Sequence, residues 1–139
     1  MNKSILSGKF LAFSMALVLS VSLFSTVTSC KDREEDPNES VNVQFQVKYS
    51  TGVNVDAIIT QVGTVQSTQF NIPSTPTTWN SEPQIVHTSK GAVHLSAIGD
   101  GVDSDSELIV NIMINGEMKA TDTAKGLNLL AETVFDFKK

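Results

Sequence analysis

The feature that most constrains the fold is a strict two-residue alternation that begins at Val41. Apolar and polar side chains alternate without exception as far as Ser50, VNVQFQVKYS. Successive side chains of a strand point to opposite faces, so this pattern predicts a half-buried strand with one apolar face. Such strands belong to antiparallel sheets that cover a core on one side and meet water on the other.

Short strand-like segments separated by turns continue to the end of the chain. Together with the first, they are expected at residues 41–49, 55–62, 64–72, 84–88, 92–98, 108–114, 117–124 and 127–137. Asn115-Gly116 is the strongest hairpin signal, because a type I′ turn needs positive φ at both central residues. Pro73, Pro76 and Pro83 break residues 73–83 into loop and edge. Seven or eight short strands without a helical period predict an all-β, antiparallel β-sandwich.

Residues 1–29 have the pattern of a bacterial export signal. Lys3 and Lys9 give a positive start, and the apolar run FLAFSMALVLSVSLF follows from Phe10 to Phe24. This run is shorter than the ~20 apolar residues that a spanning helix needs. It therefore favours a cleaved signal peptide over a short membrane anchor helix, and the leader is excluded from the fold.

The segment Val27-Thr28-Ser29-Cys30 resembles the lipobox of bacterial lipoproteins, in which an aliphatic and two small residues precede cysteine. Cys30 is the only cysteine of the chain, so an internal disulfide is excluded. The resemblance implies cleavage before Cys30 and acyl chains such as palmitate on its thiol, each stabilising membrane binding by ~0.8 kcal/mol per buried CH2. It also implies a lipid-anchored protein of the cell envelope, in the outer membrane. A free or buried thiol is the alternative.

Residues 30–40, CKDREEDPNES, are charged, lack large apolar side chains and read as a flexible tether. They also resemble the acidic export signal of surface lipoproteins of the Bacteroidetes, which implies a domain facing the medium. A solvated spacer without a sorting role is the alternative. All fifteen Asp and Glu residues follow the leader, whereas two of the ten Lys and Arg residues lie in it. This acidic balance argues against binding to nucleic acid or to an anionic membrane face.

Residues 41–139 resemble the soluble domain of the MmpS family, small mycobacterial membrane proteins that accompany MmpL transporters. The likeness rests on four segments in the same order: VKYSTG at 47–52, AIIT at 57–60, VHLSA at 93–97 and IMINGE at 112–117. It implies an all-β, antiparallel immunoglobulin-like β-sandwich of seven to eight strands, which in this chain is expected to follow the cleaved signal peptide. In that family the domain is thought to be a periplasmic adaptor for export pumps. Its members start with a transmembrane helix rather than a lipid anchor, so the fold transfers better than the function.

His87 and His94 flank the turn at Lys90-Gly91. In an antiparallel hairpin they would lie near each other, as two ligands of a metal ion do. This stretch offers no third ligand, and His94 has the opposite parity to the apolar residues beside it. Two surface histidines are therefore the simpler interpretation, and no metal site is predicted here.

An acidic loop is expected between Gly99 and Glu107. Its four acids are Asp100, Asp103, Asp105 and Glu107. Calcium prefers several oxygen ligands, so these residues are candidates for a calcium site. Their spacing does not match the EF-hand pattern, and a solvated loop is the alternative.

The sequence contains no G-x-S-x-G, Walker or dinucleotide glycine motif, and the chain is predicted not to be an enzyme and to need no cofactor. A non-catalytic accessory or adaptor module of the cell envelope is expected, docked on an envelope protein and associated with a transporter. The alternative is a surface lipoprotein that binds a ligand such as a glycan. The aromatic residues that we expect mostly in the core, leaving few for a glycan platform, are Phe45, Tyr49, Phe70, Trp79, Phe135 and Phe137.

Overall fold

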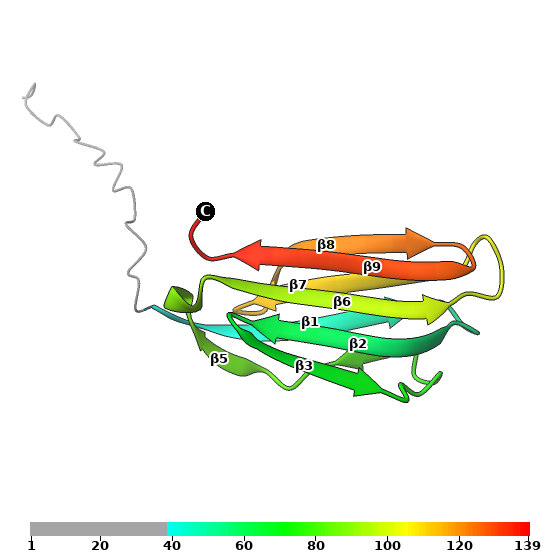
Figure 1. Ribbon diagram of the computed structural model, residues 1–139, viewed down its shortest axis with the longest axis horizontal. Helices are drawn as coiled ribbons and strands as arrows, with labels where there is room; N and C mark the ends of the chain where they lie inside the picture. Colours follow the sequence, from blue (N-terminus) through cyan, green and yellow to red (C-terminus); the bar gives the residue numbers. More distant parts are fainter. Residues whose placement is uncertain (1–38) are drawn as a thin grey trace, which may run out of the picture. The chain divides into compact units, whose positions relative to one another are not determined.

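The computed structural model describes residues 39–139 (Figure 1). The signal peptide, the cleavage motif at Val27, Thr28 and Ser29, the lipidation residue Cys30 and most of the tether lie outside this range. The elements of the described part are β1 (Ser40–Tyr49), β2 (Asn54–Val62), β3 (Val65–Phe70), β4 (Thr78–Asn80), β5 (Gln84–His87), the short 3-10 helix η1 (Thr88–Lys90), β6 (Ala92–Asp100), β7 (Glu107–Ile114), β8 (Glu117–Lys125) and β9 (Asn128–Asp136).

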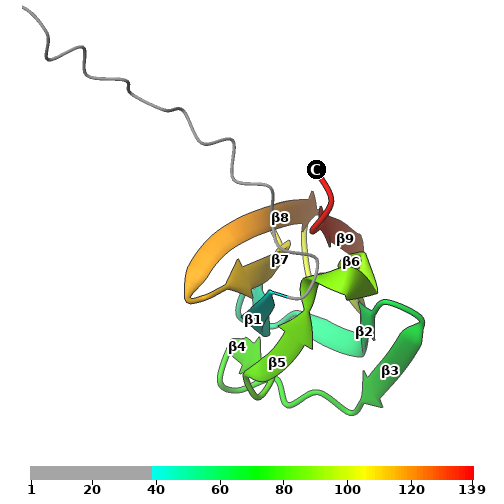
Figure 2. The ribbon, with the colours of Figure 1, turned by 90° about the vertical axis from the view of Figure 1, so that its left-hand side faces the viewer.

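These strands form two antiparallel sheets that pack against each other as two layers (Figure 2). In sheet A the order is β4–β1–β7–β8, and β5 pairs with β1 on the same side as β4. β5 takes residues Ser40–Val43 of β1 and β4 takes Gln46–Lys48. In sheet B the order is β3–β2–β6–β9. The predicted all-β, antiparallel architecture is confirmed.

The described residues contain nine strands, one more than the larger number expected from the sequence. The additional strand is β4, which lies in the proline-rich stretch between Pro76 and Pro83. Its three residues pair with β1, and Trp79 lies opposite Val47. A strand this short shows no alternation in the sequence, so only its pairing reveals it.

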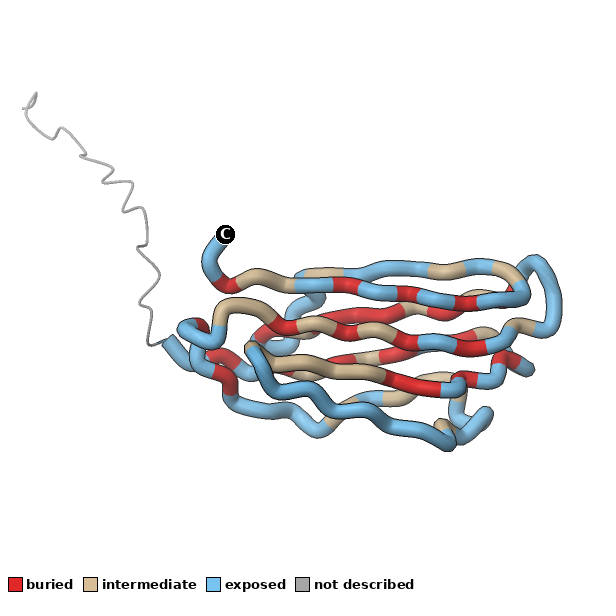
Figure 3. Tube along the Cα trace, in the orientation of Figure 1, coloured by how far each residue is buried: buried red, intermediate tan, exposed pale blue. Residues whose placement is uncertain are grey.

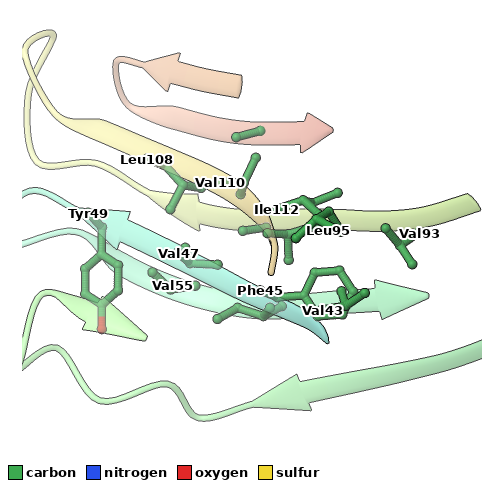
Figure 4. Packing of buried hydrophobic residues seen from close by; sticks show 14 of the residues in the cluster. Val43, Phe45, Val47, Tyr49, Val55, Val93, Leu95, Leu108, Val110 and Ile112 are labelled. Atoms are coloured by element: carbon green, nitrogen blue, oxygen red, sulfur yellow. The ribbon is translucent and has the colours of Figure 1, made fainter. Parts of the chain in front are cut away.

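The core lies between the inner faces of the two sheets (Figure 4). Every apolar residue of the alternation in β1 is buried, and Phe45 at its centre is 1% exposed. β6 alternates buried with intermediate or exposed positions, and β7 alternates buried with intermediate positions except at the buried Asn111. The alternation is visible along the trace in Figure 3. The period of two in the sequence therefore marks the inner face of these strands correctly.

The hairpin between β7 and β8 turns at Asn115-Gly116, as the sequence predicts. Asn115 has a φ of 52° and Gly116 a φ of 80°, so both central residues are left-handed. The turn also attaches to β1, because the backbone N–H of Asn42 donates to Asn115 Oδ1 over 2.9 Å and the carbonyl of Asn42 accepts from the Asn115 N–H over 2.8 Å.

Two glycines allow the sandwich to close at the end opposite Ser40. A Cβ at Gly99 would overlap the carbonyl oxygen of Asn54, and one at Gly101 would overlap the carbonyl oxygen of Gly126. The N–H of Gly101 donates to the carbonyl of Leu127 over 2.8 Å. The loop after β6 is thus held directly against the turn between β8 and β9.

The side of the sandwich between β3 and β4 is closed by side chains rather than by strand pairing. Trp79 packs partly buried against the core, and its Nε1 donates to Gln69 Oε1 over 2.9 Å. The hydroxyl of Tyr49 lies 2.6 Å from the carbonyl oxygen of Pro73 and 2.9 Å from that of Pro76, and donates to both. Tyr49 therefore fastens the connection between β3 and β4 to the end of β1.

Candidate interaction surface

The two histidines do not lie opposite each other in a hairpin. His87 ends β5 in sheet A, where its Nδ1 lies 3.0 Å from the hydroxyl of Ser40. His94 lies in β6 of sheet B, opposite Gln61 and Val134. η1 carries the chain from one sheet to the other between them, so the two rings belong to different layers.

The acidic loop is organised by its own hydrogen bonds. The carboxylate of Asp103 accepts from the N–H of Asp105 over 2.9 Å and from the hydroxyl of Ser106 over 3.1 Å. Glu107 pairs with Lys125 over 2.5 Å, and this contact raises the pKa of the Lys125 ammonium. Two of the four candidate calcium ligands, Asp103 and Glu107, are thus engaged within the fold.

Within residues 39–139, no group of three or more His, Cys, Asp or Glu side chains is arranged to hold a metal ion. The calcium site at Asp100, Asp103, Asp105 and Glu107 gains no support from this geometry and stays a prediction. In the same range, no helix is both long and apolar enough to span a membrane.

A shallow hollow of about 160 Å³ lies where β1 ends and β7 begins. Lys48, Tyr49, Ser50, Glu107 and Ile109 line it. Its volume is below the roughly 300–1,000 Å³ of typical small-molecule sites. Tyr49, one of the lining residues, is buried, and burial raises the pKa of its phenol above the ordinary 10.0. The hollow is therefore a poor candidate for a ligand site.

A continuous ladder of polar side chains crosses the outer face of sheet A, with one member from each of β4, β1, β7 and β8. The amide of Gln46 donates to Asn80 Oδ1 over 2.9 Å, and that of Asn111 donates to Gln46 Oε1 over 3.1 Å. The hydroxyl of Thr121 donates to Asn111 Oδ1 over 2.7 Å. Asn111 is only 4% exposed. Sheet A thus satisfies the polar groups at the centre of its outer face internally.

The outer face of sheet B carries an apolar row instead. Pairing aligns Phe70 of β3 with Ala57 of β2, Ala57 with Ile98 of β6, and Ile98 with Leu130 of β9. Residues directly opposite each other point to the same face, so the four side chains form one stripe across all four strands. Phe70 is 66% exposed, Leu130 60% and Ile98 41%. Single exposed apolar residues are ordinary, whereas a row of them across a sheet is a candidate interaction surface.

The apolar row, defined as Phe70, Ala57, Ile98 and Leu130, was not predicted from the sequence. The expectation that Phe70 lies mostly in the core is wrong, because it faces outward beside Ala57. The one signal was a break in alternation, where Ile98 follows Ala97 and Leu130 follows Leu129. In both pairs the first residue is buried and the second exposed.

The surroundings of the row are acidic. β2, β3, β6 and β9 contain no Lys or Arg. Their acids are Asp56, Asp100, Glu132 and Asp136, and the ion pairs of residues 39–139 involve none of them. By the period of two, Asp100 lies on the same face as Ile98 and Glu132 on the same face as Leu130. Because β6 and β9 are antiparallel, these two carboxylates flank the row on opposite sides.

No known family matches this chain, and neither does any curated protein.

Proposed function

We propose that this chain is a lipid-anchored, non-catalytic accessory protein of the cell envelope, whose domain docks on an envelope protein as an adaptor, in association with a transporter. The anchor rests on the sequence, since Val27, Thr28, Ser29 and the lone Cys30 follow an apolar leader. The docking role rests on the apolar row of sheet B, in which Phe70, Ile98 and Leu130 are exposed to solvent. We propose the outer membrane as its location, with the domain facing the medium.

The proposal takes the domain to be an immunoglobulin-like sandwich related to the MmpS soluble domain. Two antiparallel sheets packed over a shared core, in about 100 residues, are consistent with that architecture. The four segments that carry the resemblance lie in strands or in the turns next to them. They are the end of β1 with its turn, the middle of β2, the first half of β6 and the β7–β8 hairpin. Likeness at such positions supports a common fold rather than a common function.

The glycan-binding alternative has less support, because exposed aromatic rings do not gather on one surface. Among residues 39–139 the exposed aromatic ring is that of Phe70, which points away from the core beside Ala57. Trp79 lies partly buried on the inner side, where it contacts Gln69. In residues 39–139 the aromatic rings in contact with each other are those of Phe135 and Phe137, with centroids 5.4 Å apart. Because Phe137 is buried, this pair offers no open aromatic platform.

Metabolic labelling with a palmitate analogue tests the anchor. Cys30→Ala should abolish labelling and block normal processing, whereas the neighbouring variant Thr26→Ala should keep both. Mass spectrometry of the purified protein should find the acyl groups on the residue that begins the processed chain. Labelling that persists in Cys30→Ala would show the anchor to be wrong.

Crosslinking on intact cells tests the adaptor role. Capture of a transporter or an outer-membrane channel is the expected result, and capture of a polysaccharide without a protein would favour the alternative. Protease shaving of whole cells gives the orientation, because a domain facing the medium is digested without lysis. Protection until the cells are opened would contradict the surface orientation and leave the anchor unaffected.

A further inference from the structure

We infer that the apolar row of sheet B is the docking surface, and that its occupant is a protein segment with apolar side chains flanked by Lys or Arg. This inference rests on the proposed adaptor function for the existence of a protein partner. The chemistry of that partner follows from the surface alone.

The apolar row has the size and composition of a small interface centre. Three inter-strand spacings separate Phe70 from Leu130, so the row is about 14 Å long. Ile98 lies between the two more exposed ends of the row. Beside it, the small side chain of Ala57 is 9% exposed. Large apolar side chains clustered in this way are the usual centre of a protein interface, with polar groups at its rim.

Charge decides what fits this surface. Asp100 and Glu132 flank the row, and sheet B contributes four acids and no Lys or Arg. An occupant that places cationic groups over these carboxylates gains electrostatic complementarity and is steered toward the face. An occupant with an acidic rim brings like charges together, which is unfavourable.

The same charges argue against two other occupants. A second copy stacked on the row would bring its own Asp100 and Glu132 against this acidic face. An anionic membrane surface would be repelled in the same way. The row also lies near the ends of β3 and β6 and near the starts of β2 and β9, at the end of the sandwich opposite the start of β1 (Figure 1). A basic, apolar protein segment remains the occupant that satisfies both the apolar row and its rim.

A pair of defined peptides tests the inference on the full chain purified in nonionic detergent. One is a short amphipathic peptide of Leu and Lys, and the other carries Glu in place of every Lys. Fluorescence anisotropy should show that the Lys peptide binds at least about tenfold more tightly than the Glu peptide, with affinity falling as salt is added. The double variant Phe70→Ser/Leu130→Ser should weaken binding of the Lys peptide by at least about tenfold.

The matched control is Val65→Ser/Ile85→Ser, which removes two side chains that are each 71% exposed and lie off the row. Its binding should equal that of the unaltered protein. Equal binding of the two peptides, or equal losses in the two double variants, overturns the inference. So does a dimer in sedimentation experiments, or binding to anionic vesicles, that only Phe70→Ser/Leu130→Ser abolishes. Failure of lipid labelling in cells would overturn the anchor and leave these binding results standing.

Discussion

The outer faces of the two sheets differ in how their central side chains meet the solvent. On sheet A the central positions are polar, and Gln46, Asn111 and Thr121 bond to one another across the strands. On sheet B the corresponding stripe is apolar, and Phe70 and Leu130 are more than half exposed. A face that satisfies its own groups contributes to the stability of the domain. A face that leaves apolar area in water contributes little to the stability of the domain. Covering that area with a partner would make binding more favourable.

The largest expected effect on the free energy of unfolding distinguishes residues of the core from residues of the outer faces. Phe45→Ala should lower the free energy of unfolding by about 3–5 kcal/mol, because Phe45 is 1% exposed at the centre of the core. Phe70→Ala should change it by no more than about 0.5 kcal/mol. Chemical denaturation monitored by circular dichroism measures both. Comparable losses in the two variants would mean that Phe70 is covered in solution.

The second effect distinguishes the outer face of sheet A from that of sheet B by their contributions to stability. Asn111→Ala should cost about 1–3 kcal/mol, because it leaves Gln46 Oε1 and the Thr121 hydroxyl without their partner in the ladder. Thr68→Ala on the outer face of sheet B is the control and should be nearly neutral, since Thr68 is exposed. The measurement is the midpoint of urea-induced unfolding, compared between variants whose free energy of unfolding has the same dependence on urea concentration. If Asn111→Ala were as neutral as the control, the ladder would contribute nothing to stability.

The third effect concerns the link that fastens the β3–β4 connection to sheet A. Tyr49→Phe should cost about 1–2 kcal/mol at pH 7, because the carbonyls of Pro73 and Pro76 lose their donor. The pKa of Tyr49 is raised in the folded state, so its stabilising contribution is full below pH 10 and declines as the pH rises through the folded pKa. The stability difference between the wild-type protein and Tyr49→Phe should therefore narrow above pH 10. A difference that stays constant from pH 7 to pH 11.5 would contradict the raised pKa.

The smallest effect concerns the apolar row. Phe70→Ser/Leu130→Ser should leave the free energy of unfolding within about 1 kcal/mol of the wild-type value, because both side chains are mostly in water. Thermal unfolding measures the change, and Val65→Ser/Ile85→Ser again serves as the control. A loss of several kcal/mol would show that sheet B uses its outer face for stability, and the contrast between the faces would disappear.

Much of the architecture could be predicted from local patterns. The alternation of β1 identifies its buried face, and Asn115-Gly116 identifies the hairpin after β7, because both depend on neighbours in the sequence. β4 was missed because three residues between prolines carry no period. His87 and His94 do not face each other across a hairpin, because η1 carries the chain from sheet A to sheet B between them. No local pattern in the sequence indicates that crossing.

The surfaces were harder to predict because they depend on register. Phe70 and Leu130 are 60 positions apart in the chain numbering, and only the pairing of four strands places them in one row. The same holds for Gln46 and Asn111 in the polar ladder. Alternation tells which face of a strand is apolar, but it does not tell which residue on the next strand lies opposite. The sequence therefore predicted the core well and the outer faces poorly.

The position of β1 has a mechanical consequence. It is the first strand of the described residues, and it pairs with three others, β4, β5 and β7. A pull applied at Ser40 acts along the axis of β1 and loads the hydrogen bonds to these neighbours together, in shear, instead of opening them one after another. We therefore expect the domain to resist extraction from that end. Tension between the proposed lipid anchor and the proposed partner would be carried by β1, the strand with three partners.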